Sequence, residues 1–106
     1  MTQNLERARS DAFRIVVEII VEELAIPEEE ITPDTHFVHD LRVDSDDLTF
    51  GYVPAVHKRF GVVLSNAEWL KVGTPQETVD AVLEARARQG VPGPLTPSVD
   101  PEEGSP

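Results

Sequence analysis

A serine among carboxylates is the group in this sequence best suited to chemistry. Ser45 is preceded by Asp44 and followed by Asp46 and Asp47. Serine and aspartate are both preferred at the N-cap of a helix. Apolar residues then recur at every fourth position from Leu48, so the sequence predicts a helix that begins at Ser45 or one residue to either side. A serine there is either a plain helix cap or an exposed hydroxyl open to covalent modification, and the local sequence alone favours the cap.

The other reactive groups form no recognisable catalytic or metal site. The sequence has no cysteine, so it offers neither a thiolate nucleophile nor a zinc–thiolate site. His36, His39 and His57 are scattered, and with one candidate serine they suggest no Ser-His-Asp arrangement. An EF-hand loop starting at Asp40 would place Gly51 where a glutamate is required, which excludes that calcium site. We therefore expect no enzyme active site and no metal.

The charge of the chain narrows the choice of partners. The formal net charge is −11, and the stretch from Glu28 to Asp47 has eight carboxylates against one basic residue, Arg42. Such a surface repels nucleic acid and anionic membranes and attracts basic proteins. The N-terminal residues lack the apolar core of a signal peptide, and no apolar run is long enough to span a bilayer. We expect a cytoplasmic, monomeric protein that binds other proteins.

Two long helices are predicted from apolar periodicity. The first is expected from Leu5 to Leu24, where apolar residues repeat close to every 3.6 positions. The second is expected over residues 45–60, with Gly61 just past its end. Pro54 lies inside the second helix, where it removes a backbone hydrogen bond, so we expect it to kink or split the helix.

A long connection and two shorter helices complete the expected fold. The connection runs from Pro27 to about Asp44, and four of its apolar residues are expected to anchor it on the core: Ile31, Phe37, Val38 and Leu41. Capping-box sequences at residues 65–68 and 74–77 start the two shorter helices, and the last helix should end near residues 88–90. The prediction is an all-α four-helix bundle with a long first loop and a short third helix.

The domain boundary follows from a change in composition. The helical domain is expected to span residues 1–90. Residues 91–106 contain five of the nine prolines and almost no large apolar residue, so they are predicted to form a disordered, acidic, Pro-rich tail.

Several segments together resemble the acyl carrier protein family. The segment from Phe37 to Ser45 resembles the family pattern F-x-x-D-L-G-x-D-S-L, with Arg42 in place of the glycine. Residues 60–64, 65–71 and 74–83 resemble, in that order, the end of the family's second helix, its short third helix and the start of its fourth. The resemblance covers roughly residues 12–88, and the order and spacing of these segments carry more weight than any one of them.

The resemblance implies a carrier rather than a catalyst. Ser45 corresponds to the serine to which a phosphopantetheinyl transferase attaches 4′-phosphopantetheine from coenzyme A, and Asp44 to the acid before it. The arm holds acyl intermediates as thioesters for fatty-acid, polyketide or related biosynthesis. Asp40, Asp46 and Asp47 would belong to the surface that docks on basic patches of acyl-synthesising or acyl-transferring enzymes. The alternative is an unmodified carrier-like fold acting as an acidic protein-interaction module.

Two departures from the family pattern leave the register of the second helix open. Asp46 stands where the family has leucine, and the stretch from Ser45 to Phe60 is one residue longer than in common carriers. If the extra residue lies in the loop, Asp46 takes the position of the family's serine. If it lies in the helix, Ser45 keeps that position and should be exposed at the helix start. Phe50 and Tyr52 could line an acyl pocket, but we expect both, like Trp69, to pack in or beside the core.

Overall fold

The computed structural model describes residues 2–91 of the chain, and all the regular structure in that range is helical. The helices are α1 (Thr2–Leu24), α2 (Ser45–Asp47), α3 (Val53–Phe60), α4 (Asn66–Trp69) and α5 (Pro75–Gln89). A 3₁₀ turn, η1 (Glu28–Glu30), follows α1, and a π-helical turn, η2 (Leu48–Tyr52), joins α2 to α3. With α2, η2 and α3 forming one uninterrupted run, the expected all-α four-helix architecture is confirmed. The predicted tail lies outside the described residues apart from Val91.

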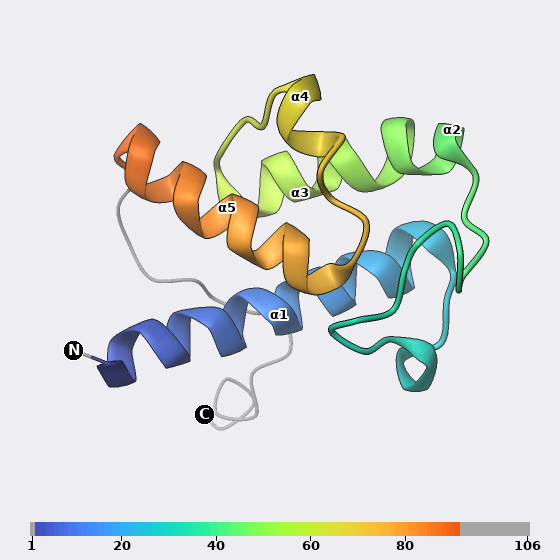
Figure 1. The fold of residues 1–106 in the computed structure, drawn as a ribbon, viewed down its shortest axis with the longest axis horizontal. Coiled ribbons are helices and arrows are strands. Elements are labelled where there is room, and N and C mark those ends of the chain that lie inside the picture. Colours follow the sequence, from blue (N-terminus) through green and yellow to red (C-terminus); the bar gives the residue numbers. More distant parts are fainter. Residues whose placement is uncertain (1, 92–106) are drawn as a thin grey trace, which may run out of the picture.

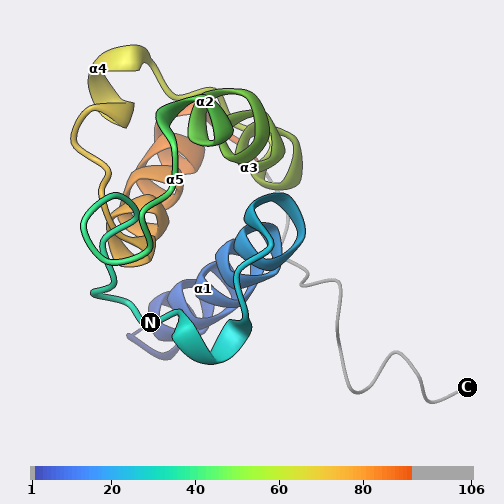
Figure 2. The same ribbon diagram turned by 90° about the vertical axis from the view of Figure 1, so that its right-hand side faces the viewer.

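The helices enclose one core. Figure 1 shows α1 passing along α5, with the α2–η2–α3 run on the other side and α4 at the outer edge. Figure 2, turned by 90°, shows α1, α5 and this run arranged around a common centre. The centre is filled by apolar side chains from all three: Ala12, Ile15, Val16, Ile19, Ile20, Tyr52, Val56, Phe60, Val79, Val82 and Ala85. These residues recur at helical spacing, which is the pattern that predicted the helices.

The first helix is longer than expected. It begins at Thr2 rather than Leu5, because its first turn is polar and gives no apolar signal. A partly buried ion pair between Arg59 and Glu18, at 2.9 Å, joins α3 to α1. No helix among residues 2–91 is both long enough and apolar enough to cross a membrane.

A buried hydroxyl pair joins η2 to α5. Tyr52 is 1% exposed, and its hydroxyl donates to Thr78 Oγ1 at 2.9 Å. Thr78 is fully buried and donates in turn to the Thr74 carbonyl at 3.3 Å. Burial raises the pKa of the Tyr52 phenol far above its ordinary value, so this group stays protonated. Each polar atom of the pair therefore has a partner, as burial requires.

The long loop is anchored much as expected, with one exception. Ile31 and Phe37 are buried and Leu41 is half-buried, whereas Val38 is exposed. The expectation for Val38 was wrong because the backbone turns tightly at this point. The N–H groups of Val38 and His39 both donate to His36 Nδ1 at 3.1 Å. The N–H of Phe37 donates to the Gly73 carbonyl at 2.9 Å, which holds the loop against the chain before α5.

Helix ends follow the sequence signals, again with one exception. Gly61 and Gly90 adopt left-handed conformations after α3 and α5, with φ of 70° and 67°, as expected of C-terminal glycines. At α4, Ser65 and Glu68 form the predicted reciprocal capping box. The box predicted at Thr74 is only half formed. Thr74 accepts from the Glu77 N–H, but the Glu77 carboxylate accepts from the Gly73 N–H instead.

Candidate functional site

Ser45 is the first residue of α2, at the position predicted for the helix start. The residue before it, Asp44, is extended, and its carbonyl accepts the N–H of Leu48 at 3.1 Å. The Asp44 carboxylate makes no capping hydrogen bond. Ser45 is exposed, and its hydroxyl has no hydrogen-bond partner within residues 2–91. The backbone N–H groups of the first helical turn have no carbonyl partner inside the helix. Ser45 therefore combines an accessible hydroxyl with a helix end that attracts negative charge.

The second helix contains a π-helical turn, η2, just before Pro54. The N–H of Val53 donates to the carbonyl of Leu48, five residues earlier, rather than to the fourth. Such a turn inserts one residue into an α-helix. Pro54 follows directly, and its ring would clash with the carbonyl four residues before it in a regular α-helix. A wider turn relieves this clash, and the helical run continues through Pro54 to Phe60 without the split that the sequence allowed. The π-helical turn lets the helix hold one residue more than a regular α-helix, and Ser45, not Asp46, is the first helical residue.

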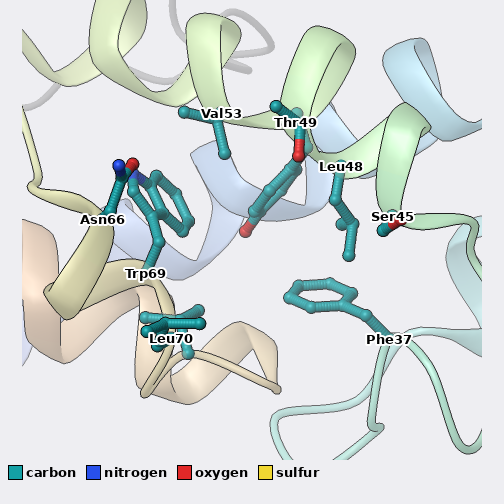
Figure 3. Close-up of a pocket in the computed structure, with 10 residues that line it drawn as sticks. Phe37, Ser45, Leu48, Thr49, Val53, Asn66, Trp69 and Leu70 are labelled. Atoms are coloured by element: carbon teal, nitrogen blue, oxygen red, sulfur yellow. The ribbon is translucent and has the colours of Figure 1, made fainter.

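An apolar pocket of about 300 Å³ lies beside Ser45. Figure 3 shows Ser45 at one end, near Leu48 and Phe37, with Asn66 and Trp69 of α4 and the following Leu70 across the pocket. Its other lining residues are Thr49, Tyr52, Val53 and Val72. Tyr52 connects the two sides: its ring centroid lies 5.0 Å from that of Phe37 and 5.9 Å from that of Trp69. A serine on an exposed helix end thus adjoins a mostly apolar cavity between the second helix and α4.

Tyr52 and Phe50, both expected to pack in or beside the core, lie in different environments. Tyr52 is buried and also lines the pocket. Phe50 is 77% exposed and lines no part of this pocket, so the expectation that it packs in the core was wrong. The pocket residues Phe37, Leu70 and Asn66 were not identified as such from the sequence. They come from a loop and a short helix, whose approach to Ser45 depends on tertiary contacts.

His57 holds α4 against the second helix. Its Nε2 accepts the N–H of Leu64 at 3.0 Å and the indole N–H of Trp69 at 3.2 Å. An imidazole nitrogen accepts only when it carries no proton, so this geometry requires neutral His57. Partial burial lowers the pKa of His57 below its ordinary value of 6.5. The neutral imidazole therefore positions Trp69, which forms one wall of the pocket.

Acidification should weaken the hydrogen bonds that His57 accepts, and the free energy of unfolding should fall with them. The folded-state pKa of His57 is lower than the unfolded value of 6.5, so folding disfavours the protonated form. The stabilisation is fully present above pH 6.5 and is lost as the pH falls below that value towards the folded-state pKa. We expect urea unfolding of the wild type to show a larger loss of stability between about pH 7.5 and about pH 5.5 than that of His57→Gln. The control is exposed His39→Gln, which should behave as wild type. Equal losses in wild type and His57→Gln would contradict this role.

Four acidic residues lie close to Ser45 in the sequence. Asp40, Asp44, Asp46 and Asp47 are all exposed. Asp40 accepts the N–H of His36 at 2.7 Å and so stabilises the loop. The other three have no ion-pair partner within residues 2–91. Four carboxylates thus lie near the serine in sequence and open to solvent.

The histidines of the loop are engaged in structure. The rings of His36 and His39 lie 4.3 Å apart, and His36 Nδ1 already accepts two backbone N–H groups. Among the described residues no group of three or more His, Cys, Asp or Glu side chains is placed to hold a metal ion.

Comparison with known protein families places the chain in a described family. The family described as "Phosphopantetheine attachment site" matches residues 14–82, well over half of the chain and with Ser45 inside the matched range. The site fits such a group on three observations. An exposed hydroxyl with no partner in the described chain is available, the adjacent helix end favours a phosphate, and an apolar pocket adjoins it.

Proposed function

Because this chain belongs to the family of phosphopantetheine attachment domains, we propose that it is an acyl carrier protein with Ser45 as its attachment residue. The domain of this family is the attachment site of covalent 4′-phosphopantetheine. The terminal thiol of that group carries acyl chains as thioesters. The observation that carries the assignment to Ser45 is its exposed hydroxyl at the first residue of α2.

The proposed attachment is a phosphoryl-group transfer to Ser45. The Oγ of Ser45 forms a bond to the phosphorus that carries the pantetheine arm of coenzyme A. The bond from that phosphorus to the adenosine 3′,5′-bisphosphate breaks, and the hydroxyl proton passes to a base of the transferase. In the product, the backbone N–H groups and the dipole at the start of α2 favour the negative phosphodiester. Asp44 is the acidic residue that precedes the site, and its carboxylate makes no capping hydrogen bond.

The pocket beside Ser45 suits the apolar part of a cargo. Phe37, Trp69 and Leu70 present apolar surface to the cavity, and apolar surface removed from water contributes about 25 cal/mol per Å². Leu70 is 88% exposed at the pocket edge, where a cargo would cover it. An acyl chain attached near Ser45 would therefore be partly sheltered from solvent between the second helix and α4.

The proposal extends to partners and setting. Carrier domains in general interact with phosphopantetheinyl transferases and with enzymes that handle acyl groups. For this chain we place Asp40, Asp46 and Asp47 in the docking surface, on the strength of their exposure and the net charge of −11. We assign the chain a carrying role without catalysis of its own, in fatty-acid, polyketide or related synthesis in the cytoplasm.

The alternative is an unmodified acidic interaction module. The observation in its favour is Asp46, a carboxylate directly after Ser45 in place of the family's leucine. This module would share the fold and the acidic surface of a carrier. It would differ from a carrier in one measurable property, the absence of any covalent group.

Intact mass separates the two functions. The protein is incubated with coenzyme A, magnesium and a phosphopantetheinyl transferase, including one from the source organism. We expect the wild type to gain one phosphopantetheine group and Ser45→Ala to gain none. Ser65→Ala is the matched control, because Ser65 is also an exposed serine at a helix start. This control should load fully despite a capping loss of about 1 kcal/mol. No gain by the wild type with any transferase would support the unmodified module.

A further inference from the structure

Phe50 is a large aromatic side chain left in solvent on the helix that carries Ser45. It is 77% exposed. Its neighbours at helical spacing are Asp46 and Asp47 on one side and Pro54 on the other, and all three are exposed as well. The outer face of this helix therefore presents two carboxylates followed by a phenyl ring.

The π-helical turn leaves Phe50 on this outer face. The residues around it are used elsewhere: Tyr52 is buried in the core, while Thr49 and Val53 line the pocket beside Ser45. Gly51 lies against α1, where a Cβ on this glycine would come within 3.7 Å of the Glu23 carboxylate. Phe50 lines neither that pocket nor the adjoining cavity near Leu70 and Lys71. Its ring is thus outside the space available to a cargo.

Phe50 and the neighbouring carboxylates have the composition typical of a protein–protein interface. Burying a phenyl side chain stabilises a protein or a complex by about 1.5–3 kcal/mol. Exposed Phe50 does not contribute this free energy in the isolated chain. Single exposed apolar residues are common, but this ring adjoins carboxylates that have no ion-pair partner within residues 2–91. Aromatic anchors ringed by polar residues carry much of the energy of protein–protein interfaces. The carboxylates require that the facing surface of a partner be basic.

We infer that Phe50 is the apolar anchor of the docking surface, and that it inserts into an apolar pocket of the partner enzyme rimmed by lysine or arginine side chains that pair with Asp46 and Asp47. This inference rests on the proposed carrier function. Phe50 is five positions after Ser45, which corresponds to about 7.5 Å along a helix axis. In the transferase, the apolar pocket must therefore lie at least that far from the position where the enzyme acts on the serine hydroxyl.

The two parts of this surface respond differently to salt. Attraction between exposed charges is screened as ionic strength rises, whereas burial of a phenyl ring is not. Replacing Asp46 and Asp47 with asparagine should slow loading at low salt and have little effect at high salt. Replacing Phe50 should slow loading at both. This difference distinguishes an anchor from a residue that only supports the acidic surface.

The test measures kcat/KM for loading by the source organism's transferase with coenzyme A. We expect Phe50→Ala to lower it about tenfold or more at low and high salt, and Phe50→Leu to restore part of the loss. The matched control is Val63→Ala, since Val63 is 66% exposed but lies in the segment after α3. It should remain within about twofold of wild type. Circular dichroism and the thermal midpoint show whether each variant is folded.

The possible outcomes separate the two proposals. If the wild type loads and Phe50→Ala loads as fast as Val63→Ala, the anchor is wrong and the carrier function stands. If Phe50→Ala is slow only at low salt, Phe50 is no anchor and acts through the carboxylates. If no transferase loads the wild type, the carrier function fails and the anchor inference fails with it.

Discussion

Replacing Tyr52 with alanine is expected to lower the free energy of unfolding by about 3–5 kcal/mol. The side chain is 1% exposed and packs between Phe37 and Trp69, with ring centroids 5.0 and 5.9 Å away. Alanine would leave a cavity where the loop, the second helix and α4 meet. It would also leave Thr78 Oγ1 without its donor at 2.9 Å. Since small domains are stable by only about 5–15 kcal/mol, the loss is a large share of the total.

Urea unfolding followed by circular dichroism measures this effect, and Tyr52→Phe is the matched control. Phenylalanine keeps the ring and removes only the hydrogen bond to Thr78, so we expect a loss of about 1 kcal/mol. Similar losses for the two variants would mean that the hydrogen bond rather than the packing stabilises this region. A loss below about 1 kcal/mol for Tyr52→Ala would contradict the place of this ring in the core.

Moving the hydroxyl by one residue is expected to abolish loading. In the double variant Ser45→Ala/Asp46→Ser, the only serine at the start of α2 is displaced by about 1.5 Å along the axis and about 100° around it. Misplacement by about 1 Å can cost about 100-fold in rate. We therefore expect the double variant to load at least about 100-fold more slowly than wild type, close to Ser45→Ala alone. The measurement is the rate of phosphopantetheine gain by intact mass.

Asp46→Ser alone is the control for the lost carboxylate. It keeps Ser45 and adds a second serine, so it should gain one group and no more. Loading of the double variant as fast as this control would contradict the register, because it would show that position 46 serves as well as position 45.

The elements that the sequence predicted well are those whose signals are local. The apolar period of α1, the capping box at Ser65 and the glycines after α3 and α5 each depend on a few neighbouring residues, and all are confirmed. The start of the second helix at Ser45 is confirmed for the same reason, since Asp44 and the residues after it carry the signal. The position of Ser45 was therefore predictable, and so was its exposure if the extra residue fell in the helix.

The features that the sequence missed depend on choices between competing local structures. Pro54 indicated an irregularity in the second helix, but a kink, a break and a π-helical turn can each remove the clash of its ring with the preceding turn. In the structure the π-helical turn is combined with burial of both Tyr52 and Val56 on the core, a tertiary contact that the local sequence does not specify. Phe50, within the same turn, is left in solvent. At Thr74, the Glu77 carboxylate had two backbone donors within reach, and it binds the N–H of Gly73 rather than that of Thr74.

The pocket was the least predictable part of the site. Its residues come from a loop, the second helix, α4 and the segment that follows α4. Phe37 reaches it because the backbone of the loop binds the Gly73 carbonyl, and Trp69 because its indole binds His57. Neither contact leaves a periodic mark in the sequence. A cavity between elements distant along the chain requires their tertiary arrangement to be known.

The most direct test is to find which residue carries the phosphopantetheine in cells. The protein is purified from its source organism, digested and analysed by tandem mass spectrometry, with another phosphopantetheine-carrying protein from the same cells as a positive control. We predict that the peptide containing Ser45 carries the group and that its fragments locate the group on Ser45. A group on a different residue, or a Ser45 peptide found only unmodified while the control protein is loaded, would contradict the assignment.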